Sequence, residues 1–93
     1  MKTFADLKFN EVNTGHFQAT MQFGAYQLSV VLLPQSTLYE AAIFDDDQFV
    51  QLPGIHPDFY NDWSDNVVPG LMPNDVSGIM KKLKTIEVAN KLN

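Results

Sequence analysis

The stretch FQATMQFGAYQLSVVLL, residues 17–33, carries the strongest structural signal in this chain of 93 residues. Apolar and polar side chains alternate from Phe17 to Phe23, which is the pattern of a strand buried on one face. Gly24 and Ala25 follow, with glycine at the first position of a two-residue loop, as a type II′ turn prefers. The stretch therefore predicts an antiparallel hairpin that sets each apolar residue opposite another on the same face.

The same face continues through two further loops. A loop at Pro34–Thr37 pairs Val30 with Ala41, and a loop at Asp45–Gln48 pairs Phe44 with Phe49 and Ala41 with Leu52. Because a slip of one residue would turn every side chain to the opposite face, agreement among the hairpins supports this register. The predicted core face contains Phe17, Ala19, Met21, Phe23, Leu28, Val30, Leu32, Ala41 and Ile43.

Two further segments complete the expected fold. Residues 4–9, FADLKF, are expected to form a first strand, joined to the strand at Phe17 by a loop rich in Asn10, Asn13, Thr14 and Gly15. Near the C-terminus, apolar residues recur at the spacing of one helical face: Val76, Ile79, Met80, Leu83 and Ile86. Pro73 suits the first turn of this helix, although Asn74 could instead be its N-cap.

These patterns predict a single α+β domain over residues 1–93. Its architecture is an antiparallel β-meander of about five strands packed against one C-terminal α-helix. The hydrophobic fraction of 45% is sufficient for one core at this length, whereas the chain is too short for two.

The second face of the predicted sheet is more apolar than a solvated face should be. It would carry Val31, Leu33, Leu38, Ala42, Phe44 and Phe49. Either residues 52–72 fold back over it, or it is a partner surface, which includes contact with a second copy of the chain. We expect the first arrangement, because the segment brings apolar residues that otherwise have no place: Ile55, Phe59, Tyr60, Trp63, Val67, Val68 and Leu71.

Composition argues against several classes of function. The chain has no cysteine, which rules out disulfides and cysteine-ligated zinc, and no arginine, the residue best suited to phosphate and guanine contacts. Asp6 interrupts the apolar run that a signal peptide needs, and no stretch approaches the roughly 18 apolar residues of a spanning helix. We therefore expect a cytoplasmic protein that binds neither nucleic acid nor membrane.

The acidic residues are concentrated in the middle of the chain. Residues 45–75 contain seven aspartates and no lysine or arginine. Within this block, aromatic side chains alternate with acids, a composition typical of surfaces that anchor a basic partner. The predicted partner-binding residues are Asp45, Asp46, Asp47, Asp58, Phe59, Tyr60, Asp62, Trp63 and Asp65. The alternative is that the aromatics anchor an irregular segment while the acids face water.

No motif indicates catalysis, a metal or a cofactor. His56 and Asp58 could supply two metal ligands, but this spacing is common by chance, and His16 lies in or beside a predicted loop. Asp45-Asp46-Asp47 lacks the alternate spacing and the distal acid of a calcium loop. We expect no catalytic residue and no enzyme activity; a structural homodimeric module and a small enzyme are the alternatives.

Four segments resemble small accessory proteins of tailed bacteriophages and prophages. These segments are FADLKF at 4–9, YQLSVV at 26–31, YEAAIF at 39–44 and the run from Asp65 to Lys82. The chain departs from that pattern at Asp45-Asp46-Asp47, and at 72–75 where a serine-led capping box is usual. The resemblance implies a phage accessory gene product in the bacterial cytoplasm and no catalytic residue. Our leading hypothesis is a non-enzymatic interaction protein that binds and modulates a host protein, with a basic target such as a nucleic-acid-handling or defence enzyme.

Overall fold

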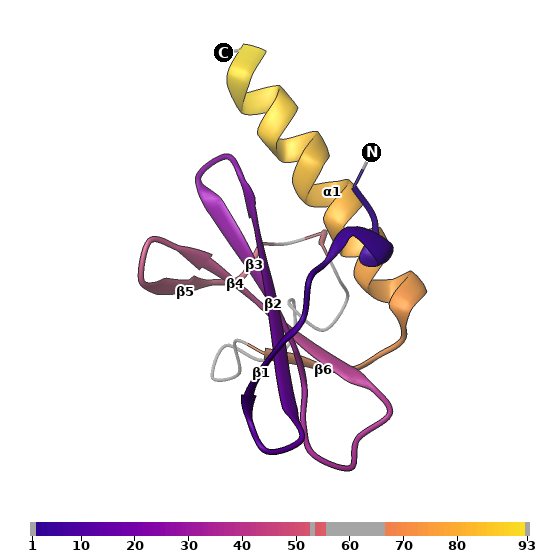
Figure 1. Cartoon of the computed structure of the whole chain (residues 1–93). Coiled ribbons are helices and arrows are strands. Elements are labelled where there is room, and N and C mark those ends of the chain that lie inside the picture. Colours follow the sequence, from indigo (N-terminus) through magenta and orange to yellow (C-terminus); the bar gives the residue numbers. More distant parts are fainter. Residues whose placement is uncertain (1, 53, 56–66, 93) are drawn as a thin grey trace.

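The computed structural model describes residues 2–52, 54–55 and 67–92. A short 3-10 helix, η1 (Phe4–Asp6), precedes the strands, and one long helix, α1 (Pro73–Leu92), ends the chain. The strands are β1 (Asn10–Asn13), β2 (His16–Phe23), β3 (Tyr26–Leu32), β4 (Tyr39–Asp45), β5 (Gln48–Val50) and β6 (Val67–Leu71). They form one antiparallel sheet, with α1 and η1 on the same side of it (Figure 1). The predicted α+β fold, a meander against one C-terminal helix, is confirmed.

The hairpin registers at the centre of the sheet are those that the alternation predicts. Phe23 lies opposite Tyr26 across the first turn, and Val30 lies opposite Ala41 in the second pair. The third loop is shorter than predicted, because Asp45 pairs with Gln48 and leaves a two-residue turn, but Phe44 still faces Phe49. A match at three successive turns indicates that burial of one face selects the pairing.

Alanine substitutions at two glycines are expected to change the stability of the fold in opposite directions. Gly24 has φ +61°, and a methyl group there would lie 3.2 Å from Glu87 Cγ, so Gly24→Ala is expected to destabilise the fold by about 1–2 kcal/mol. Gly78 lies inside α1 with open space around its Cα, so Gly78→Ala should stabilise by about 0.4–1 kcal/mol. Denaturant unfolding of both variants checks this pair. If both variants changed the free energy of unfolding by the same amount and sign, the positive φ at Gly24 and its close approach to Glu87 would be contradicted.

The outer edge of β4 is shared by two strands. Ile43 to Asp45 pair with β5, whereas Tyr39, Ala41 and Ala42 pair with β6. Both strands run antiparallel to β4, so together they act as one edge strand interrupted after Val50 and resumed at Val67 (Figure 1). The predicted pairing of Ala41 with Leu52 is therefore wrong, because Val68 occupies that position.

A bulge in β6 explains how proline fits into this edge. Between the Ala41–Val68 and Tyr39–Leu71 pairs, β4 contributes one residue and β6 contributes Pro69 and Gly70. Proline has no amide hydrogen for a ladder and is confined to edges and bulges, while Gly70 takes φ +72°, a conformation that glycine adopts without strain. Because proline and glycine normally interrupt strands, the local sequence does not predict β6.

The predicted first strand is wrong. Residues 4–6 form η1, in which the Asp6 carboxylate accepts a hydrogen bond of 2.8 Å from the backbone N–H of Thr3, and the strand begins only at Asn10. Local bonding by an aspartate side chain competes with strand formation. The aromatic rings of this segment pack on Tyr39, with ring centroids 4.9 Å apart for Phe4 and 5.6 Å for Phe9.

The core lies between the sheet and α1. Of the predicted core face, Ala19, Phe23, Leu28, Val30, Ala41 and Ile43 are buried, and Met21 packs against them half-buried. Phe17 and Leu32 lie opposite each other on this face, as predicted, but they are only half-buried and lie outside the buried cluster. They are at the end of the hairpin opposite the Gly24 turn, whereas Gly24 lies against Glu87 of α1.

Ile55, Val68 and Leu71 also belong to this core. The sequence predicts that residues 52–72, which include these three, fold over the opposite face of the sheet. For Ile55, Val68 and Leu71 this expectation is wrong. Phe59, Tyr60 and Trp63, which completed that expected cover, lie outside the described residues. Among the described apolar residues of that segment, only Val67 lies on the opposite face, next to its cross-strand partner Ala42.

The helix packs through the predicted stripe. Val76, Ile79, Met80 and Leu83 are each at most 1% exposed, and Ile86 is half-buried at the edge of the core. The alternative N-cap at Asn74 is wrong, since α1 begins at Pro73 and the Asp75 carboxylate accepts a 2.8 Å hydrogen bond from the Met72 N–H. Ser77 accepts a 2.9 Å hydrogen bond from the Phe4 N–H, which ties η1 to the helix.

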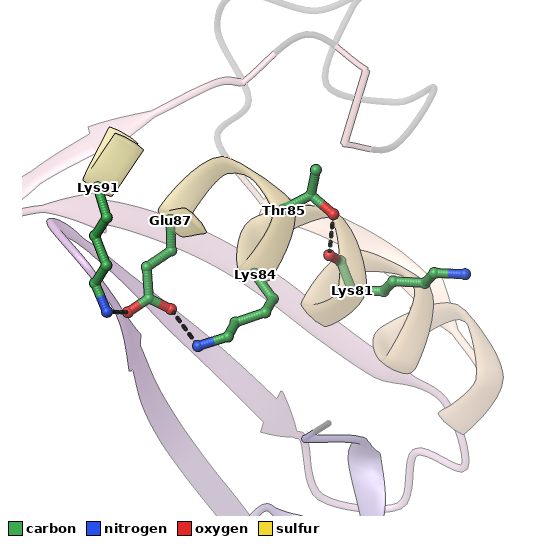
Figure 2. A network of polar contacts seen from close by, with 5 residues as sticks. All are labelled: Lys81, Lys84, Thr85, Glu87 and Lys91. Carbon is green, nitrogen blue, oxygen red and sulfur yellow. Dashed lines mark hydrogen bonds and ion pairs between the residues drawn. The ribbon is translucent and has the colours of Figure 1, made fainter. Parts of the chain in front are cut away.

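A charged cluster lies near the end of α1. The Glu87 carboxylate accepts a hydrogen bond from Lys84 at 3.1 Å and lies 3.3 Å from Lys91, while Lys81 extends away from it (Figure 2). Hydrogen bonds from Lys84 and then Lys91 hold the pKa of Glu87 below its ordinary value of 4.5. Since the charged form is favoured in the folded state, its contribution to stability is present above that value and is lost as the pH falls through the folded pKa.

We therefore expect Glu87→Gln to be less stable than the wild type at neutral pH. The difference in unfolding midpoint should shrink as the pH is lowered below 4.5, because the wild-type carboxyl then becomes neutral as well. Glutamine keeps the packing on Gly24, so the comparison isolates the charge. Urea unfolding at neutral and acidic pH checks the prediction. A difference that does not change with pH would show that the ion pairs are not its source.

Candidate interaction face of the sheet

The sheet has a second face, opposite α1, which we call the outer face. None of the described helices or strands packs over it (Figure 1). Because side chains alternate along each strand, this face presents the residues between the core positions. It is polar on β2, with Gln18, Thr20 and Gln22, and becomes apolar toward β4, β5 and β6, with Ala42, Phe44, Phe49 and Val67. The outer face is thus amphipathic from one edge to the other.

An apolar hollow of about 170 Å³ lies on this face. It is lined by Ser29, Val31, Glu40, Ala41, Ala42, Phe44, Phe49 and Val67. Phe44 and Phe49 pair across the strands, with ring centroids 4.4 Å apart, and Phe49 is 48% exposed. Ser29 Oγ accepts a 2.9 Å hydrogen bond from Gln18 Nε2, so its hydroxyl is already partnered within the protein. The hollow therefore offers a ligand mainly apolar contact.

A second, polar hollow of about 270 Å³ lies at the turn end of the sheet. It is lined by Gln22, Ala25, Gln27, Asp46 and Asp47. The β2–β3 turn and the β4–β5 turn meet here, and Gln22 Nε2 donates a 2.8 Å hydrogen bond to the carbonyl oxygen of Gly24. Carboxylates and amide oxygens at the rim make this hollow suited to a hydrogen-bond donor with positive charge.

Acidic residues and lysines are separated along the sequence. Residues 9–71, which contain every strand, include eight acidic residues and no lysine or arginine. All six lysines lie at positions 2, 8, 81, 82, 84 and 91, in the N-terminal segment and in α1. The described strands therefore carry no lysine or arginine that could neutralise Glu40 or the Asp45–Asp47 acids.

The predicted partner-binding residues divide into two groups. Asp45, Asp46 and Asp47 are exposed at the end of β4 and in the following turn, and Asp46 and Asp47 line the polar hollow. The others, Asp58, Phe59, Tyr60, Asp62, Trp63 and Asp65, lie outside the described residues, and their role stays a prediction.

Sequence reasoning identified part of the apolar hollow. Val31, Ala42, Phe44 and Phe49 were assigned correctly to the second face by their alternation. Gln22, Gln27 and Val67 were not proposed as site residues. The first two read as ordinary polar positions of a strand, and Val67 joins the site only because β6 pairs with β4.

Other kinds of site were sought among the described residues. Within residues 2–52, 54–55 and 67–92, no three His, Asp or Glu side chains are placed to share a metal ion. His16 is half-buried at the start of β2, and His56 and Asp58 lie outside the described part. In the part of the chain that the structure describes, no helix combines the length and apolar character needed to cross a membrane.

Comparisons with protein-family models, with curated proteins and with solved structures find no match to this chain.

Proposed function

We propose that this chain is a non-enzymatic interaction protein that binds a basic protein partner on the outer face of its sheet. The observation that carries the proposal is the apolar hollow beside an acidic turn, on strands that contain no lysine or arginine. Exposed apolar area supplies contact energy, whereas the acids select a basic surface and accelerate encounter. In this account the scaffold of sheet and helix positions the face and takes no part in chemistry.

The resemblance to phage accessory proteins supports a more specific form of the proposal. The partner would then be a host protein in the bacterial cytoplasm, and binding would modulate its activity. A basic partner of this kind is typical of proteins that handle nucleic acid, including defence enzymes, since their substrate-binding surfaces carry lysine and arginine.

A matched pair of variants tests the proposal in bacterial lysate. Phe49 and Val88 are 48% and 45% exposed, one on the outer face and the other on α1. Phe49→Asp is expected to lose a partner that the wild type retains, while Val88→Asp retains it, because only the first change places a charge in the apolar hollow. Retention by both variants, or loss by both while each remains folded by circular dichroism, would contradict the proposed face.

A homodimer is the second candidate function, favoured by the exposed apolar residues Leu33, Leu38 and Phe49. Light scattering of the purified chain separates the two candidates. We expect a monomer, because pairing two outer faces would bring acidic surfaces together without bases to offset them. A dimer that Phe49→Asp dissociates would favour the structural module instead.

A further inference from the structure

We propose that the outer face recognises one short extended segment of its partner, in which an apolar anchor and a lysine or arginine lie about two residues apart. The inference rests on the proposed function and specifies the chemistry of the ligand. It follows from the two hollows, which have different linings and lie next to each other on one face.

The register of the sheet shows how close the two hollows are. Gln27 lines the polar hollow and lies opposite Phe44, which lines the apolar hollow. Ser29 and Ala42, the next pair of the same two strands on this face, belong to the apolar hollow. Side chains on one face of a strand recur about every 7 Å, so Gln27 of the polar hollow and Ser29 of the apolar hollow are one such step, or two residues, apart. An extended ligand segment has the same repeat.

The apolar hollow has the size of one large side chain. Its volume of about 170 Å³ is similar to that of an engineered cavity of about 150 Å³ that holds a benzene ring. Phe44 and Phe49 supply aromatic surface on which a ring or a branched aliphatic group can pack. We therefore assign this hollow to a single anchor such as Phe, Leu or Ile.

The polar hollow favours a cation in the neighbouring position. Asp46 and Asp47 are exposed carboxylates at its rim, and an ammonium or guanidinium group can donate to them and to the amide oxygens of Gln22 and Gln27. The long stem of lysine or arginine can cover apolar surface on the way. An acidic side chain in the same position would face Asp46, Asp47 and Glu40 with no basic residue among the residues that line either hollow.

The test is an NMR titration of the ¹⁵N-labelled full chain with the peptide acetyl-Gly-Phe-Gly-Lys-Gly-amide at millimolar concentration. Three matched peptides replace Lys by Gln, Lys by Glu, or Phe by Ala. We expect shifts at the amides of Ala42, Phe44 and Phe49 together with those of Gln27, Asp46 and Asp47. Loss of the charge should weaken binding about two- to fivefold, as for an exposed ion pair, and loss of the ring about tenfold or more. The Glu peptide should bind most weakly.

Variants of the chain assign each peptide preference to one of the two hollows. Changing Asp46 and Asp47 together to Asn should remove the preference for Lys over Glu but keep the preference for Phe over Ala. Asparagine tolerates the positive φ of 54° at Asp46, so the turn is retained. Glu11→Gln, at the opposite edge of the sheet, should leave both preferences unchanged.

Three results would overturn the inference: no shifts at these amides, equal binding of the Lys and Glu peptides, or outer-face broadening that depends on chain concentration alone and so indicates a second copy. Its failure is distinct from failure of the proposed function. If Phe49→Asp abolishes partner capture but the peptide does not bind, the outer face remains the site and only the segment model is wrong. If capture survives Phe49→Asp, the proposed function is wrong whatever the peptides do.

Discussion

Replacing Leu83 by Ala is expected to lower the free energy of unfolding by about 2–5 kcal/mol. Leu83 is 0% exposed and faces the sheet from the middle of α1, where it belongs to the same buried cluster as Met80 and Val30. Truncation removes buried methyl groups and leaves a cavity that a close-packed interior fills only in part. The first turns of α1 contain few residues with high intrinsic helix propensity, so packing against the sheet must stabilise the helix.

Equilibrium urea unfolding measures this change, with Val88→Ala as the matched control on the same helix. Val88 is 45% exposed, so its truncation should change stability by no more than about 0.5 kcal/mol. A loss below about 0.5 kcal/mol for Leu83→Ala as well would show that the helix does not pack through this stripe, and the described fold would be wrong.

Changing Asp45, Asp46 and Asp47 together to Asn is expected to slow association with the proposed basic partner by about tenfold at low salt. Exposed charges act mainly by steering the encounter, so the dissociation rate should change little and the salt dependence of association should flatten. Surface plasmon resonance at several ionic strengths measures both rates. The same effect is predicted for Asp58, Asp62 and Asp65, which lie outside the described residues.

The control for the triple variant is Glu11→Gln, which removes one acid at the β1 edge and keeps an oxygen to accept the hydrogen bond from the Gly15 N–H. It should reduce association only slightly. A triple variant that matches the wild type in association rate and in salt response would show that the acidic turn does not face the partner.

Local patterns predict the centre of this fold well, because the information needed is local. The alternation around Gly24 fixes which residues of β2 and β3 meet, and the helical spacing from Val76 to Ile86 fixes the face of α1. Where pairing depends on distant segments, the prediction fails. Val68 takes the position expected for Leu52 opposite Ala41, and no feature of residues 50–52 indicates that the edge strand is interrupted there.

The candidate site shows the same division. Alternation alone assigns Phe44 and Phe49 to the outer face, and composition alone marks the Asp45–Asp47 turn as acidic. The polar hollow, in contrast, forms only because two turns from different hairpins lie side by side, which brings Gln22 next to Asp46 and Asp47. This juxtaposition follows only when the registers of two successive hairpins are combined, and neither hairpin predicts it alone.

Site-specific photo-crosslinking in bacterial cells tests the outer face most directly. A benzophenone amino acid replaces Phe49 in one variant and Val88 in another, so that the two probes have similar exposure on opposite sides of the fold. The account predicts a covalent adduct with a basic protein from position 49 and none from position 88. An adduct from position 88 alone, or adducts of equal yield from both positions, would contradict it.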